Sequence, residues 1–252
     1  MNYNSMIVTF WFDEINDFKS IQTALDENMK DYFSPFNLTG IPSNFDPIVP
    51  RIISTTLGGH TTFNMSKVNV QLQTNFDKEF VSDFEKCYDY VKEKTLKVFD
   101  ILTNKCSLKI LYSAIVVNCE YETENPVSRI VSELFNANKW ADRECCELGI
   151  KYSTILNEKY YSITCLNDAK VVSFTKKVEP GTVQNIVFPL IPQREVTIDK
   201  KVISFVEEIN DKYSFDTVEN YNTNIEVIKE LFETCSSRIN KLSQNINQGK
   251  LL

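Results

Sequence analysis

Glycine and histidine are scarce in this chain of 252 residues, which holds six glycines and one histidine. The glycines form no Gly-rich loop of the kind that cradles nucleotide phosphates, which argues against nucleotide-dependent chemistry. The single histidine, His60, rules out metal sites built on several histidines. No Gly-x-Ser-x-Gly segment is present, so a serine hydrolase with a nucleophile elbow is also ruled out. We therefore expect no cofactor and lean towards a protein that is not an enzyme.

Long apolar runs and clustered positive charge are also missing. No stretch reaches the roughly 18 apolar residues of a membrane span, and Met1–Ser5 lacks the basic region and apolar core of a secretory signal. The formal net charge is −7, and basic residues cluster only as the pairs Lys176–Lys177 and Lys200–Lys201. Phosphate backbones are bound by clustered Lys and Arg, so nucleic acid is an unfavoured partner. We expect a cytoplasmic protein without a membrane partner.

Cysteine usage agrees with that compartment. The seven cysteines are an odd set and show no Cys-x-x-Cys spacing. Several fall at apolar positions of expected strands and helices, where free cysteine behaves as a small hydrophobic side chain. Reduced, buried thiols are the natural interpretation.

The strongest pattern that is present covers residues 216–249. Its apolar positions recur at steps of three and four, which predicts one helix of about 32 residues with a single apolar seam. Asp216 is placed as its N-cap and Gly249 as its C-cap. The seam has two interpretations: packing against the sheet or another helix of the same chain, or homodimerisation as in a coiled coil. Its central residues are Ile225, Ile228, Phe232, Ile239 and Leu242.

The remaining periodicity predicts an α+β protein with two antiparallel sheets and long helices. In the first half, we expect strands at 6–12, 52–57, 61–65, 68–72 and 107–121, and helices at 13–30 and 76–103. This order is close to the ferredoxin-like split unit. In the second half, we expect a helix at 127–138 and strands at 147–156, 159–166, 169–178 and 202–209, with two-residue turns at Asn157–Glu158 and Asn167–Asp168. The expected units are 1–124 and 125–252, with one continuous domain as the alternative.

A proline-marked arm at Ser34–Arg51 is the candidate binding surface. Its four prolines forbid a regular element, while its apolar residues argue against free disorder. Paired glycines give the nearby hairpin end at Gly58–Gly59 the backbone freedom to approach a ligand, although a plain turn is the competing explanation. The candidate binding residues are Phe36, Phe45, Arg51, Gly58, Gly59 and His60.

A divalent-metal site is the alternative chemistry. Glu120, Glu122 and Glu124 alternate along the end of an expected central strand, so their carboxylates share one face and could hold Mg²⁺. Asp168–Ala169–Lys170 has the acidic-x-Lys spacing of a nuclease half-motif. A strand end that frays into solvent would show the same glutamates, so both explanations stay open.

The order of these elements resembles a sporadically distributed family of uncharacterised bacterial proteins of about this length. The resemblance covers most of the chain in outline, including the hairpin strand Val68–Leu72 and the last strand before the terminal helix. It implies no functional residues, because that family has no assigned activity. Separately, the many Asn, Ile and Lys residues fit a protein encoded by an AT-rich bacterial or phage genome. We therefore expect a non-catalytic cytoplasmic protein that binds another protein or itself. A metal-dependent, nuclease-like hydrolase or a small-ligand sensor is the alternative.

Overall fold

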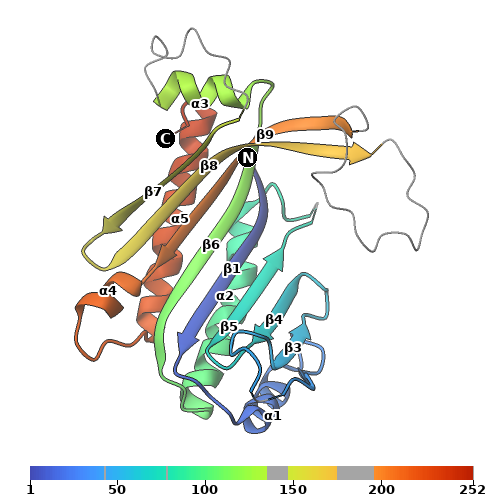
Figure 1. Ribbon diagram of the computed structural model, residues 1–252, viewed down its shortest axis with the longest axis vertical. Coiled ribbons are helices and arrows are strands. Elements are labelled where there is room, and N and C mark those ends of the chain that lie inside the picture. The colour runs from blue at the N-terminus through green and yellow to red at the C-terminus, as the bar shows by residue number, and fades with distance from the viewer. Residues whose placement is uncertain (43, 78, 135–146, 175–195, 252) are drawn as a thin grey trace.

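One antiparallel sheet of nine strands organises the protein. The computed structural model describes residues 1–42, 44–77, 79–134, 147–174 and 196–251. The strands follow the order β2-β3-β4-β5-β1-β6-β9-β8-β7 across the sheet (Figure 1). Their bounds are β1 Asn2–Phe12, β2 Asn37–Leu38, β3 Ile52–Thr55, β4 Thr61–Met65, β5 Asn69–Asn75, β6 Ile110–Glu122, β7 Gly149–Leu156, β8 Tyr160–Phe174 and β9 Val196–Asn210.

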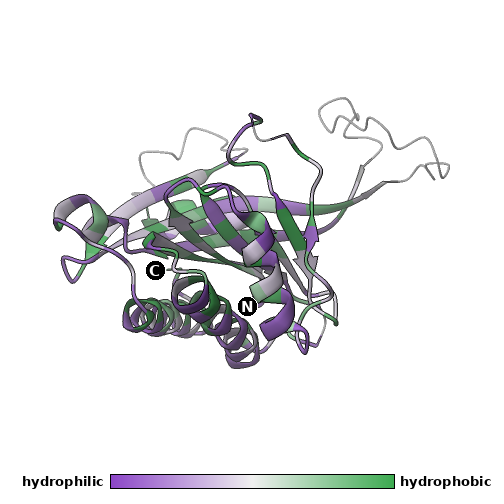
Figure 2. Ribbon diagram, turned by 90° about the horizontal axis from the view of Figure 1, so that it is seen from below, coloured by the Kyte–Doolittle hydropathy of each residue, from purple (hydrophilic) through white to green (hydrophobic). Residues whose placement is uncertain are grey.

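The long helices cover one face of this sheet, and the face that they leave open is contacted by the short helix Lys212–Thr217, whose Phe215 ring lies 5.4 Å from the Tyr112 ring of β6. The helices are α1 Phe18–Met29, α2 Phe84–Asp100, the π-helical turn η1 Ile101–Lys105, α3 Pro126–Leu134, α4 Lys212–Thr217 and α5 Ile225–Asn247. Figure 2 shows the long helices on one side of the sheet. Strand β1 shows the resulting alternation, since Met6, Val8 and Phe10 are fully buried while Ile7 and Trp11 are only partly covered. The core therefore lies between the sheet and α1, α2 and α5.

The prediction of two sheets is wrong, because β9 joins the two halves. Strand β9 pairs with β6 on one side and with β8 on the other, both antiparallel. Val206, for example, lies opposite Asn118 of β6 and Cys165 of β8. Periodicity locates a strand but does not identify its neighbours, so this long-range pairing could not be read from the sequence.

The predicted helix of about 32 residues is also wrong, since its first residues end the separate helix α4 and only the 23-residue α5 forms a continuous helix. The break runs through Val218, which is extended, and Asn220, which has a φ of 57°. Asn224 then caps α5 by accepting hydrogen bonds from the N–H groups of Glu226 and Val227. Val218 and Tyr221 keep the helical spacing in sequence, but they do not belong to one helix.

The structure also corrects the predicted starts of two helices and the position of one turn. Helix α1 begins after Asp17 and α2 after Asp83, whose side chains accept the capping hydrogen bonds, so both start later than predicted. The turn at Asn157–Glu158 is confirmed, with φ values of 50° and 53°. The turn expected at Asn167–Asp168 is wrong, because β8 runs through both residues. The predicted ends at 135–138 and 175–178 lie outside the described residues.

Helices α2 and α5 contact each other as well as the sheet. The ring of Phe232 on α5 meets the ring of Tyr88 on α2 edge-on, with 5.6 Å between centroids. Both helices contribute to the same buried cluster as the strands of both halves. No helix in the described part of the chain is long and apolar enough to cross a membrane.

Candidate functional site

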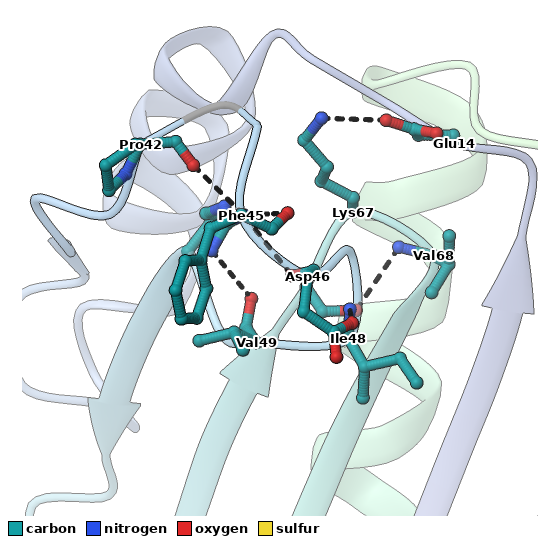
Figure 3. Close-up of polar contacts among 10 residues, drawn as sticks. Glu14, Pro42, Phe45, Asp46, Ile48, Val49, Lys67 and Val68 are labelled. Atoms are coloured by element: carbon teal, nitrogen blue, oxygen red, sulfur yellow. Dashed lines mark hydrogen bonds and ion pairs between the residues drawn. The ribbon is translucent and has the colours of Figure 1, made fainter.

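The proline arm is held in place by a buried arginine. Arg51 is 4% exposed, and its guanidinium donates hydrogen bonds of 3.2–3.4 Å to the backbone carbonyls of Pro42, Phe45, Asp46 and Val49. The loop closes around these contacts (Figure 3). Its backbone also joins the sheet, since Lys67 N–H donates to the Pro47 carbonyl at 3.0 Å. The predicted binding residue Arg51 is thus buried and holds the arm in place through these hydrogen bonds.

Exposed apolar residues are frequent in the arm and the segment that follows it in the sequence. Of the nine large hydrophobic residues that are exposed in the described chain, five lie between Leu38 and Leu57. Phe45 is 55% exposed and Ile48 is 63% exposed, and Figure 3 shows both pointing away from Glu14 and Lys67. Ile53, paired with Asn64 in the sheet, is exposed on the open face. We call Phe45, Ile48 and Ile53 the arm patch.

A shallow hollow of about 220 Å³ adjoins the arm patch. Ile48 lines it together with polar side chains of β4 and β5, among them Asn64 and Gln71. Phe36, in contrast, is 1% exposed and packs edge-on against Phe63 at 5.0 Å. The predicted binding residue Phe36 is therefore part of the core.

The structure does not bring the predicted Gly58–Gly59–His60 segment to the arm patch. The segment lies in the β3–β4 turn, whereas the arm enters at the opposite end of β3. Gly59 has a φ of 75°, which a turn requires and glycine permits. His60 packs edge-on against the rings of Phe80 and Tyr90, at 5.3 and 6.0 Å, and its Nδ1 lies 3.8 Å from Asp77.

A buried lysine, missed by the sequence reasoning, lies next to this aromatic group. Lys94 is 7% exposed, and its ammonium lies 3.4 Å from the centre of the Tyr90 ring. The same ammonium lies 5.6 Å from the centre of the Tyr32 ring. Burial lowers the pKa of Lys94. Lys94 is thus a cation held among tyrosine rings.

The predicted glutamates do not assemble into a metal site. The Glu120 carboxylate accepts hydrogen bonds from Lys200 and from Asn4, the latter at 3.3 Å. Burial opposes its ionisation, but these hydrogen bonds hold the pKa of Glu120 below its ordinary value. Asp168 is also engaged, since it accepts the N–H of Leu148 at 2.7 Å. Within the described ranges, no three His, Cys, Asp or Glu residues are placed to hold a metal ion.

The predicted self-association seam faces the chain's own sheet. Ile228, Phe232 and Ile239 are at most 1% exposed. Ile225 and Leu242 are partly buried against the same core. This packing takes up the surface that a homodimer through the seam would need.

A second site, missed by the sequence reasoning, is a cleft of about 280 Å³ between α5 and the sheet. Strands β7, β8 and β9 line one side of it, and α5 lines the other with both apolar and charged side chains. The lining residues are Tyr152, Thr154, Thr164, Glu207, Arg238, Ile239, Lys241, Leu242 and Asn245.

Glu207 and Arg238 form the centre of this cleft. Glu207 is 4% exposed, and its carboxylate accepts hydrogen bonds from Ser162 at 2.9 Å and Thr164 at 2.5 Å. Arg238 Nε donates to the same carboxylate, and Arg238 Nη2 lies 3.5 Å from Thr164 Oγ1. Every oxygen of the buried carboxylate therefore has a donor, which a buried charge requires.

One sequence signal could have indicated Glu207, though not its partner Arg238. Ile203, Phe205, Glu207 and Ile209 share one face of β9, so an acid stands at a core-facing position. A charge in such a position needs a partner, and that signal was overlooked.

No family model, curated protein or solved structure matches the chain.

Proposed function

We propose that this protein is a non-catalytic binding protein that docks another protein through the arm patch. The observation that carries the proposal is the exposure of Phe45 and Ile48 on a loop whose carbonyls are held by buried Arg51. A loop that is already fixed loses little conformational entropy when a partner binds. Exposed apolar patches of this kind are typical of interaction sites.

The charges around the arm patch favour an apolar partner segment. The Asp46 carboxylate accepts the N–H of Ile48 at 3.0 Å, and Lys67 pairs with Glu14 at 2.7 Å. Lys67 is thus paired with an opposite charge, and the Asp46 carboxylate is engaged by the arm's own backbone. We therefore infer a partner that contributes aliphatic or aromatic side chains, with a polar backbone group placed in the hollow beside Asn64 and Gln71.

Cysteine chemistry supports a cytoplasmic setting for this binding. All five cysteines in the described part of the chain are free thiols. Burial raises the pKa of the Cys87 and Cys119 thiols to about 12, which keeps them protonated and poorly reactive. Buried free thiols of this kind fit a reducing compartment.

The test compares two double variants in the native host. Phe45→Ser with Ile48→Ser removes two of the three apolar side chains of the arm patch. Ile155→Ser with Val218→Ser removes two side chains of similar exposure elsewhere, 52% and 54%. We expect quantitative affinity purification to recover a protein with the wild type and the control but not with the arm variant. That protein, once purified, should bind the wild type directly.

Two other outcomes would contradict this proposal or change the partner that it assigns. Identical co-purifying proteins for all three forms would contradict the proposal. Concentration-dependent sedimentation that only the arm variant abolishes would identify a second copy of this chain as the partner. Thermal unfolding of each variant checks that its fold is intact.

A further inference from the structure

We propose that the cleft between α5 and the sheet binds a small organic carboxylate with an apolar body. This site is separate from the arm patch and independent of the function proposed for it. The argument starts from the guanidinium of Arg238. An arginine has five N–H donors, and the two described contacts of Arg238 go to Glu207 and Thr164. The other donors have no partner among the described residues, and the side chain is 31% exposed at the cleft.

A second cation stands beside Arg238. Lys241 follows three residues later on α5, so both side chains lie on one side of the helix. Lys241 lines the same cleft and is exposed, and within the described ranges no hydrogen bond or ion pair engages its ammonium. Two cations therefore face one carboxylate, Glu207, whose oxygens are already occupied by Ser162, Thr164 and Arg238. The surplus charge in the cleft is positive, in a chain whose net charge is −7.

Glu207 acts as a positioning residue in this arrangement. Its ion pair holds the Arg238 Nε against the sheet and Nη2 lies near Thr164, while no described contact engages Nη1 of this cleft-lining, 31% exposed side chain. A planar guanidinium edge matches the two oxygens of a carboxylate. The fixed geometry lowers the ordering cost of binding such a group.

The remainder of the cleft indicates the body of the ligand. Tyr152 and Leu242 supply ring and aliphatic surface, while Thr154 and Asn245 supply neutral polar groups. The cleft of about 280 Å³ is just below the roughly 300–1,000 Å³ that is common for small-molecule sites. A ligand with one negative group on a small apolar body would match both the excess positive charge and the apolar lining of the cleft. A phosphate fits less well, because its extra charge and oxygens would need more donors.

The test uses benzoate, its uncharged analogue benzamide, and inorganic phosphate as probes. Binding is followed by ¹H–¹⁵N NMR shifts of residues in β7 and α5. We expect saturable benzoate binding, with benzamide weaker by about tenfold or more because it lacks the charge-assisted hydrogen bonds. Lys241→Gln should weaken benzoate binding by about two- to fivefold, as expected for a partly exposed ion pair.

Lys229→Gln is the matched control, because Lys229 is on the same helix but pairs with Glu226 outside the cleft. It should leave benzoate binding unchanged. Arg238→Lys, which keeps the charge but loses the planar edge, should weaken benzoate more than benzamide. Equal affinity for benzoate and benzamide, no effect of Lys241→Gln, or no saturable binding of benzoate at millimolar concentration would overturn the proposal. Phosphate that binds more tightly than benzoate would overturn the assignment to carboxylates.

Discussion

Asp211 accepts two hydrogen bonds from Ser113, a residue 98 positions earlier in the chain. The Ser113 N–H lies 2.6 Å and the Ser113 hydroxyl 3.2 Å from Asp211 Oδ1. The other carboxylate oxygen accepts the hydroxyls of Tyr221 at 2.7 Å and Thr223 at 2.5 Å. Asp211 is fully buried. One carboxylate thus ties β6, the end of β9 and the segment that leads into α5.

Asp211→Ala should destabilise the protein severely. It removes the only described acceptor for the Ser113 side chain and leaves buried hydroxyls without a partner, at about 1–3 kcal/mol for each unsatisfied group. We expect a total loss of about 3–5 kcal/mol in the free energy of unfolding, measured by denaturant titration. Asp216→Ala removes an exposed carboxylate paired with Lys212 and should cost less than about 1 kcal/mol. Equal losses in the two variants would contradict the structural role of Asp211.

The same carboxylate should make stability depend on pH. Burial raises the pKa of Asp211 above its ordinary value of 3.8, although the hydrogen bonds from Thr223 and Ser113 oppose this. A raised pKa in the folded state means that folding favours the protonated form. The contribution is complete below the unfolded pKa and is lost as pH rises through the folded pKa.

Asp211→Asn isolates this effect. The asparagine oxygen can accept the Ser113 N–H, while its amide can donate to the hydroxyls of Tyr221 and Thr223, which can turn to accept. The wild type should therefore lose stability relative to Asp211→Asn as pH rises above 3.8. Denaturant titrations of both proteins across acidic and neutral pH measure the difference. A constant difference would show that the pKa of Asp211 is not raised.

Arg238→Met should cost more stability than the loss of a surface ion pair. It leaves Glu207 buried without its cation, for which we expect a loss of about 3–5 kcal/mol in the free energy of unfolding. Glu207→Gln added to Arg238→Met should restore part of that loss, because the uncharged amide is cheaper to bury. Denaturant titration of the two single variants and the double variant measures the coupling. Strict additivity would mean that the two side chains do not interact.

Arg51→Met should release the arm. Loss of the hydrogen bonds to the carbonyls of Pro42, Phe45, Asp46 and Val49 leaves these groups without their buried donor. We expect a loss of about 2–4 kcal/mol and faster hydrogen exchange at 44–49. Lys19→Met, an exposed change on α1, is the control and should leave the exchange unchanged. Unchanged exchange in Arg51→Met would mean that the arm is held by other contacts.

Much of the local structure was predictable, because alternation and helical spacing are local properties. The strand at 6–12, the turn at Asn157–Glu158 and the apolar face of α5 at Ile228 and Phe232 all appear in the structure. The break before α5 was not predicted, since Tyr221 keeps the helical spacing while its hydroxyl binds Asp211. The Asn-rich run at 220–224 supplies both the positive φ of Asn220 and the N-cap of α5, and this local signal outweighed the helical spacing of the apolar residues.

The candidate sites were less predictable than the elements. Phe36 and Phe45 look alike as aromatic arm residues, yet Phe36 is buried against Phe63 while Phe45 faces solvent. Arg51 is a charged residue, which suggests exposure, but its guanidinium points inwards and donates hydrogen bonds to backbone carbonyls. The cleft depends on contacts between Thr164, Glu207 and Arg238, which come from three separate elements. Such contacts are set by the pairing of β8 with β9 and the placement of α5, which no local pattern contains.

The position of β9 also governs how the chain is completed during synthesis. A ribosome releases β6 long before β9, so β6 has a strand neighbour only on the β1 side until β9 has emerged. Among the described strands, β9 alone pairs the β7–β8 hairpin with the rest of the sheet. The nascent protein therefore carries an open, largely apolar strand edge through much of its translation, which favours contact with chaperones or neighbouring chains. The arrival of one late strand closes that edge and joins both parts of the molecule in a single step.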